Sequence, residues 1–389
     1  MAEVANEPPP AAEVAPEAPE VEVAPAAAVP SVPQKPKTPF EQLTAPEGED
    51  DVDLPTTFEG WLGLVGNGTN RFTRIVMEHP EAPEKLTVLN LSKLRNVDDE
   101  GTEGLERMTS LERLVLDGAG TDAMTLSRAS RLPALKVISI AGSVVRKPLE
   151  LGDNPFPAVE RLTASGAQLN RDALLAIARM HELRVLEIPQ AGLTNEAVML
   201  LKPLMKLEEV DFSRNVNLGD AGLAELVNAK QIRTLNLDIT GVRGPGLLFL
   251  AQARVFDNLT DLSLMGTTLA DEMAPALMAM ARLERLDLRQ TTIRDRGLSL
   301  IPQLKALRHL SLENCKDLTV NGFIYLKANS TLESLNVSRN NQLNDPMLPV
   351  LASMKALRKL NLIDTGFTPE GVQRLREVLP LTEIEFSEN

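Results

Sequence analysis

The fold of this chain can be inferred from LERLDLRQTTIRDRGLSLIPQLKA, residues 283–306. Its first half has leucines at the first, fourth and sixth positions, which is the alternation of a short, half-buried strand. Side chains of a strand point alternately to its two sides. We therefore expect Leu286 and Leu288 to point into a core. Arg285 and Asp287 are expected to point outward.

The second half of the same stretch, GLSLIPQLKA, predicts a helix on the other side of a turn. Leu298, Ile301 and Leu304 are three residues apart and form one apolar stripe. Asp, Asn or Thr in the turn before the stripe can accept hydrogen bonds from the helix's first N–H groups. The stretch is therefore one strand, turn and helix unit of about 24 residues.

This frame recurs along the chain at spacings of 24 to 27 residues. The units begin at Leu86, Leu111, Leu135, Val159, Leu183, Leu207, Ile232, Leu259, Leu283, Leu307, Leu332, Leu357 and Leu381. One unit cannot bury its apolar stripe alone, but stacked units cover each other. The predicted fold is an α/β solenoid, a curved array with a parallel β-sheet on its concave face and helices on its convex face. Residues 144–158 depart from the frame and are expected to cross without a regular helix.

The repeats resemble the leucine-rich repeat family over about residues 86–389. Two segments carry a closer resemblance, to the 24-residue, cysteine-containing subtype of bacterial and F-box-associated repeats: Asp220-Ala-Gly222-Leu223 and Asp295-Arg-Gly297-Leu298. The uninterrupted repeat and the lack of a catalytic constellation in the sequence favour a non-enzymatic protein that binds another protein. Contacts are expected at the outward strand positions, because these form the concave surface on which such solenoids present contacts.

Three regions follow from the composition. Residues 1–55 hold twelve acidic residues, two lysines and many prolines, and we expect a disordered acidic Pro/Ala/Glu-rich arm. Residues 56–85, with Trp61 and several other apolar residues, are expected to form an N-terminal cap. Residues 86–389 make the solenoid, with about 12 repeats and a final strand. The net charge of −14 belongs mainly to the arm.

Composition and spacing also argue against several functions. Clustered basic residues are needed to bind phosphates, so nucleic acid is not an expected partner. We find no motif for a cofactor, and the three histidines lack the spacing of metal ligands. The sequence has no apolar run of about 18 residues that would span a bilayer. The start of the sequence has no secretory signal, which predicts the cytoplasm, or a secreted protein if a signal was removed.

The chain's single cysteine, Cys315, lies in ENCKDLTVNG, residues 313–322, with an acid two residues after it. Some bacterial effectors join leucine-rich repeats to a ubiquitin-ligase domain with a Cys-x-Asp motif, but there the cysteine lies in a separate helical domain. Here the cysteine is at the ninth position of its unit, which is small or polar in most units: Ala119, Ser143, Ala167, Ala191, Asn215, Thr240, Thr267, Thr291, Asn340 and Thr365. Buried cysteines are common. We predict a structural residue and no catalytic site.

The candidate binding residues are charged residues in and beside the strands. Acids predominate in the middle units, and bases toward the C-terminus. They are Glu187, Glu209, Asp211, Asp238, Asp261 and Asp287, followed by Arg285, Arg289, Arg308, His309, Arg339 and Lys359. The predicted function is a scaffold that binds a protein partner on this bipolar face.

Three alternatives remain open from the sequence. The first is a structural protein that self-associates through an uncapped C-terminal end, where LTEIEFSEN (381–389) would be an edge strand guarded by acids. The second is an F-box-type substrate adaptor, suggested by Leu54-Pro55 in DLPTTFEGWLGLV (53–65). The third is catalytic use of Cys315, which predicts rapid labelling by a thiol reagent.

Overall fold

The structure is a computed structural model that describes residues 86–92, 102, 104–119, 121, 123–269, 271 and 274–387. The described residues all belong to the unit Pro55–Asn389. The predicted arm (1–55), the predicted cap (56–85) and the F-box-like stretch (53–65) lie outside the described residues.

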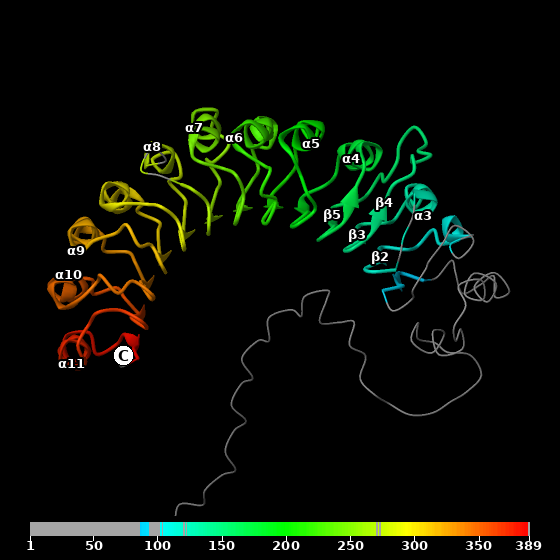
Figure 1. Ribbon diagram of the computed structural model, residues 1–389. Coiled ribbons are helices and arrows are strands. Elements are labelled where there is room, and N and C mark those ends of the chain that lie inside the picture. The colour runs from blue at the N-terminus through cyan, green and yellow to red at the C-terminus, as the bar shows by residue number, and fades with distance from the viewer. Residues whose placement is uncertain are drawn as a thin grey trace, which may run out of the picture. The chain divides into compact units, whose positions relative to one another are not determined.

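A parallel sheet of 13 strands runs through the described part, with neighbouring strands in sequence order apart from the short β4 and β6 (Figure 1). Each repeat unit adds one three-residue strand, as the periodicity predicts. The strands are β1 (Val88–Asn90), β2 (Arg113–Val115), β3 (Val137–Ser139), β5 (Arg161–Thr163), β7 (Val185–Glu187), β8 (Glu209–Asp211), β9 (Thr234–Asn236), β10 (Asp261–Ser263), β11 (Arg285–Asp287), β12 (His309–Ser311), β13 (Ser334–Asn336), β14 (Lys359–Asn361) and β15 (Glu383–Glu385).

Short helices lie on the outer side of the curve and the strands on its inner side (Figure 1). Their type varies from unit to unit, and several are 3₁₀ helices (η). They are η3 (Leu105–Arg107), α3 (Ala123–Ala129), α4 (Arg171–Ala178), α5 (Asn195–Leu200), α6 (Asp220–Leu223), η4 (Ala224–Asn228), α7 (Pro245–Gln252), α8 (Ala274–Leu277), η6 (Asp295–Gln303), α9 (Val320–Phe323), η7 (Ile324–Ala328), η8 (Asp345–Met347), α10 (Leu348–Ser353) and α11 (Pro369–Val378).

The unit at 283–306 confirms the predicted core positions. Leu286 and Leu288 are buried. The stripe of Leu298, Ile301 and Leu304 is buried too, although most of it lies on the 3₁₀ helix η6. A 3₁₀ helix has three residues per turn, so residues three apart share one side. The stripe therefore points at the core because its spacing suits this helix.

The ninth-position residues form the predicted ladder behind the strands, and all ten of those named above together with Cys315 are buried except Ala191, which is partly buried. Asn215 is fully buried; its Nδ2 donates to the carbonyls of Ile188 and Phe212, both at 2.8 Å. Its Oδ1 accepts from the N–H groups of Ala191 at 3.0 Å and Leu193 at 2.9 Å. These bonds join two consecutive units. Buried polar groups in the turns are thus satisfied by the side chains at this position.

The Asp-x-Gly-Leu segments form joints between units. Asp220 Oδ1 accepts from the backbone N–H groups of Gly244 at 3.1 Å and Gly246 at 2.9 Å, at the start of the next unit's helix. A Cβ added at Gly246 would lie 2.8 Å from the carbonyl oxygen of Asp220. Glycine is therefore required where a helix start packs against the preceding aspartate. Asp271 contacts the N–H of Gly297 at 3.1 Å in the same way.

The third unit lacks a helix, as predicted. Its residues 146–158 are irregular, and two short strands, β4 (Val144–Val145) and β6 (Gln168–Leu169), pair beside them. Phe156 is nearly fully buried and fills the core in this unit. The irregular segment is held on the outside by Arg179, which donates to the carbonyls of Gly152 and Asp153.

None of the helices in the described residues has the length and apolar character needed to cross a bilayer.

Candidate functional site: the concave face of the sheet

We define the concave face as the side chains at the third, fifth and seventh positions of the units, which share one side of the sheet. Ten of the twelve candidate residues lie on it. Glu209, Asp261, Arg285, His309 and Lys359 are at third positions, Glu187, Asp211 and Asp287 at fifth positions, and Asp238 and Arg289 at seventh positions.

Two candidate residues lie beside the concave face instead. Arg308 is at a second position, just before β12, and pairs with Glu333. Arg339 is at an eighth position, after β13, where its φ of 59° is in the left-handed region. Arg308 therefore lies where the strands begin and Arg339 lies beyond where they end.

The acidic middle of the face contains a pair of acids on neighbouring strands. Glu187 on β7 and Asp211 on β8 are register partners. Glu187 accepts from Arg161 at 3.1 Å and from Thr163 at 2.7 Å. Asp211 accepts from the backbone N–H of Ser213 at 2.8 Å and has no ion pair within the described residues. One carboxylate of this pair is therefore neutralised and the other is not.

Arg161 is a residue of this face that our sequence interpretation missed. Its guanidinium pairs with Glu187 and lies 3.6 Å from Glu209. It occupies the third position of the fourth unit, so aligning the third positions would have found it. The acidic middle is thus less negative than the acids alone suggest.

Asp238 is a half-buried carboxylate at a seventh position. The hydroxyl of Ser263 donates to it at 2.5 Å and the backbone N–H of Met265 at 2.8 Å. Burial raises the pKa of Asp238, and the nearby Asp287 adds to this effect. The two hydrogen bonds lower the pKa and only partly offset the burial.

A depression of about 500 Å³ lies in the face over β9 to β13. It is lined by the short side chains of Ser263 and Ser311 and by the longer ones of Arg285, His309 and Arg289. Arg285 pairs with Asp261, and this hydrogen bond raises the pKa of Arg285. The Ser311 hydroxyl is buried and has no hydrogen-bond partner within the described residues.

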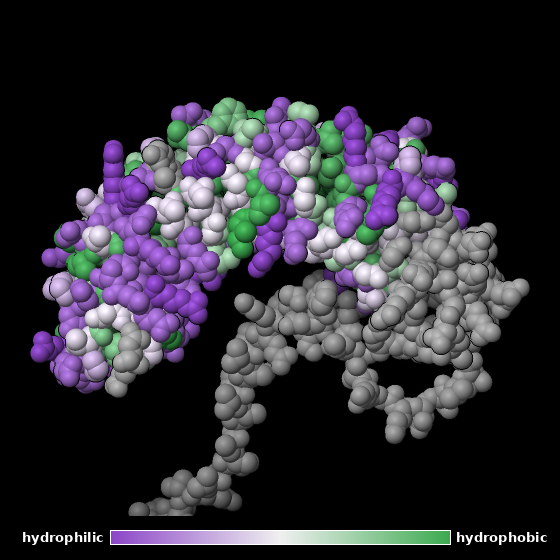
Figure 2. All heavy atoms as spheres, viewed as in Figure 1, coloured by the Kyte–Doolittle hydropathy of each residue, from purple (hydrophilic) through white to green (hydrophobic). Residues whose placement is uncertain are grey.

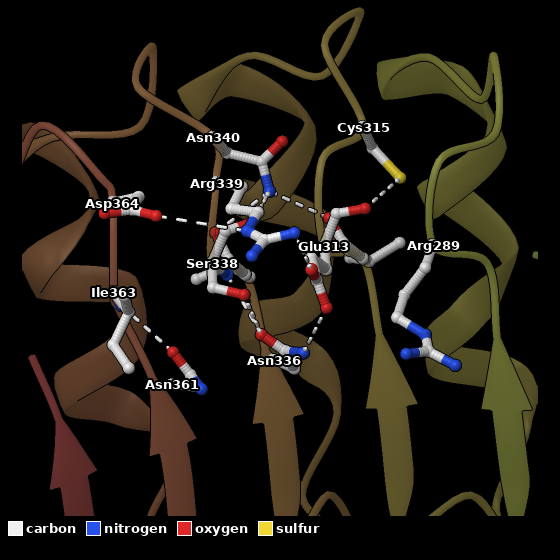
Figure 3. A network of polar contacts seen from close by, with 12 residues as sticks. Arg289, Glu313, Cys315, Asn336, Ser338, Arg339, Asn340, Asn361, Ile363 and Asp364 are labelled. Carbon is white, nitrogen blue, oxygen red and sulfur yellow. Dashed lines mark hydrogen bonds and ion pairs between the residues drawn. The ribbon is translucent and has the colours of Figure 1, made fainter.

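A polar network lies beside the depression on the C-terminal side (Figure 3). Arg339 extends between two acids, with Glu313 at 3.3 Å and Asp364 at 3.9 Å. Asn336 donates to Glu313 at 3.3 Å. Figure 2 shows hydrophilic side chains gathered over these C-terminal units. Each of the five arginines and lysines predicted toward the C-terminus pairs with an acid, so their charges are balanced locally.

Cys315 is a structural residue of the buried ladder, as its position predicts. It is fully buried, and Sγ lies 3.1 Å from the carbonyl oxygen of Leu288. Burial raises the pKa of the thiol. A nucleophilic cysteine needs exposure and a lowered pKa. The geometry is the opposite of what catalysis by Cys315 requires.

Comparisons with known proteins agree with this architecture. A family model described as "Leucine Rich repeat" matches residues 204–227 and 328–346. A search of the curated proteins finds no match. Among solved structures, the chain is similar to one in a TLR13–ssRNA13 complex, with TM-score 0.55 and 20% identity over 78% of this chain and 42% of that chain. It is also similar to one in the mouse RP105/MD-1 complex, with TM-score 0.53 and 17% identity over 72% and 46%.

An internalin, inlF, from Listeria monocytogenes is similar over 82% of this chain and 94% of that chain, at 18% identity and TM-score 0.49. The chain covers less than half of the TLR13 and RP105/MD-1 chains, and at these identities the likeness is one of fold. The matched repeats, the 13-stranded parallel sheet and the outer helices lead to one conclusion. The described part of the chain is a leucine-rich repeat solenoid.

Proposed function

We propose that this protein is a non-enzymatic scaffold that binds a protein partner on its concave face. The observation that carries the proposal is the register pair of Glu187 and Asp211. Arg161 neutralises Glu187, whereas Asp211 forms no ion pair within the described residues. A basic group of a partner would therefore supply the cation that Asp211 lacks.

The proposal also rests on where the other charges lie. Exposed charged side chains recur on strand after strand of one continuous surface, the surface that such solenoids present to partners. The face has few aromatic residues, so charge and shape would dominate recognition. The finer resemblance, to the cysteine-containing bacterial and F-box-associated subtype, is a proposal supported by the Asp-x-Gly-Leu segments alone.

The test is binding by the full chain and by two charge-reversed variants. Asp211→Lys places a base opposite Glu187, which should not harm the fold. Glu377→Lys makes the same charge change on the exposed side of α11, near its C-terminal end, where a base is favourable. Each protein is immobilised and exposed to an extract of the source cells, and bound proteins are identified by mass spectrometry.

We expect one protein to be retained by the wild type and by Glu377→Lys and lost with Asp211→Lys. Titration of that purified protein should then show affinity at least about tenfold weaker for Asp211→Lys, because reversal replaces an attraction by a repulsion. Equal retention by all three proteins would contradict a role for the concave face.

A second candidate function is self-association through the sheet edge at β15. Leu381, just before this strand, is 74% exposed, and Val378 at the end of α11 is also exposed. Light scattering of the full chain over a range of concentrations tests it. A mass that rises with concentration, and that Leu381→Glu returns to the monomer value, would support self-association. A constant monomer mass would exclude it.

A further inference from the structure

Acceptor groups in the depression over β9 to β13 already accept hydrogen bonds from other groups of the chain. Asp287 accepts from the side chain of Arg289 at 2.6 to 2.9 Å and from its backbone N–H at 3.0 Å. Asp261 accepts from Arg285 and from the hydroxyl of Thr260. The Oδ1 atom of Asn336 accepts from the N–H and the hydroxyl of Ser338. The carboxylates and this amide oxygen are therefore occupied.

By contrast, several hydrogen-bond donors of the depression have no acceptor within the described residues. A guanidinium has five N–H donors. Arg285 uses its Nε for Asp261, and none of the described residues accepts from its Nη groups. The Nδ2 of Asn236, the imidazole of His309 and the buried Ser311 hydroxyl also have no partner in the described part of the chain. The depression therefore suits a ligand rich in acceptors.

The arginines are also held in place before any ligand arrives. The ion pair with Asp261 orders the side chain of Arg285, and that with Asp287 orders the side chain of Arg289. Prior ordering reduces the entropy lost on binding. Three acids, Asp287, Glu313 and Asp238, act on the Arg289 guanidinium, so a further anion is less favourable there.

Arg285 is the better position for an anion. It has His309 as its register partner on β12, and the acids that act on it are Asp261 and Glu284. An arginine matches a carboxylate through two parallel N–H donors. The depression of about 500 Å³ that Arg285 and His309 line together with short serine side chains leaves room for the chain that carries the carboxylate.

We propose that this depression binds an Asp or Glu side chain of an extended segment of the partner protein, with Arg285 and His309 as the contacting residues. This inference rests on the proposed function and adds the chemistry of the partner. The partner would present a base toward Asp211 and an acid toward Arg285. The two contacts belong to separate strands of the same face, β8 and β11.

The test follows the imidazole resonances of the full chain by NMR. The chain has three histidines, so His309→Gln identifies the His309 signal. The probe is a blocked peptide of five Gly-Glu repeats, with five Gly-Gln repeats as the control. We expect the Glu peptide to shift the His309 signal to saturation and to leave His181, which precedes β7 outside the concave face, unmoved.

Two variants test whether the response of the His309 signal to the Glu peptide depends on Arg285. Arg285→Gln should weaken binding of the Glu peptide at least about tenfold, because it removes the charged donors. Arg254→Gln makes the same change in the turn after α7, away from the depression, and should bind like the wild type. Thermal unfolding of both variants checks that the fold is kept.

Several outcomes would overturn the inference. They are an unresponsive His309, equal shifts of His181 and His309, and the same saturable shift produced by acetate alone, which would make this a small-anion site. A fourth is a His309 signal that changes when the twelve acids of residues 1–55 are replaced by amides, which would identify the chain's own arm as the occupant. An unresponsive His309 with Asp211-dependent partner binding would reject the inference and leave the proposed function standing.

Discussion

Replacing Asn215 by alanine should cost more stability than any single-hydrogen-bond substitution in the same ladder. The side chain is fully buried and makes four hydrogen bonds of 2.8 to 3.0 Å with backbone groups of two units. At about 1 kcal/mol net for each bond, the loss is about 4 kcal/mol. Domains are stabilised by about 5–15 kcal/mol in total, so this is a large fraction.

The matched comparison is Thr240→Val in the next unit. Thr240 donates one hydrogen bond, to the carbonyl of Leu237 at 2.7 Å, and valine keeps its shape. The expected loss is about 1 kcal/mol. Urea unfolding of the wild type and both variants, followed by circular dichroism, gives the free energies of unfolding. A loss for Asn215→Ala within about 1 kcal/mol of that for Thr240→Val would refute the assignment of the ladder as the joint between units.

Three further predictions follow from the structure. Gly246→Ala should destabilise the protein by about 1–3 kcal/mol in urea unfolding because its Cβ would press on the backbone of Asp220, whereas Gly219→Ala, whose Cβ meets nothing closer than 3.6 Å, should cost less. Cys315 should react with a thiol reagent slowly in the native protein and rapidly in urea, and equal rates would contradict its burial. Asp238→Asn should raise the free energy of unfolding at pH 7, because the folded pKa of Asp238 is raised and its charged form is disfavoured. The gain should shrink as pH falls through the folded pKa toward the unfolded value of about 3.9; a gain that does not vary with pH would exclude ionisation as its cause.

Much of the fold was predictable because apolar periodicity and side-chain alternation act within one unit. Leu286, Leu288 and the ninth-position ladder needed only the frame of the repeat. The irregular third unit was predictable for the same reason, since its residues break the frame. Helix type was not predictable in this way. The stripe in η6 fits a 3₁₀ helix as well as an α-helix, and packing against neighbours decides between them.

Ten of the twelve candidate residues could be placed on the concave face from their positions in the unit, but Arg161 was missed and the ion pairs were not predictable. Neighbouring units place Arg285 beside Asp261, and Arg161 between Glu187 and Glu209, so much of the apparent bipolarity is neutralised locally. The depression arises from the lengths and conformations of side chains on five strands together. No single unit contains that information, and a motif search within units does not find it.

The joint made by Asp220 and Gly246 has a consequence for how such an array changes in length. Each half of the joint is encoded in a different unit, with the carboxylate in one and the glycine in the next. A copied unit that contains both halves, such as residues 283–306 with Asp295 and Gly297, brings a carboxylate for its successor and a glycine for its predecessor. Gene duplication of whole units would therefore insert new repeats without breaking a joint. A duplication cut within the turn would leave one helix start without its acceptor.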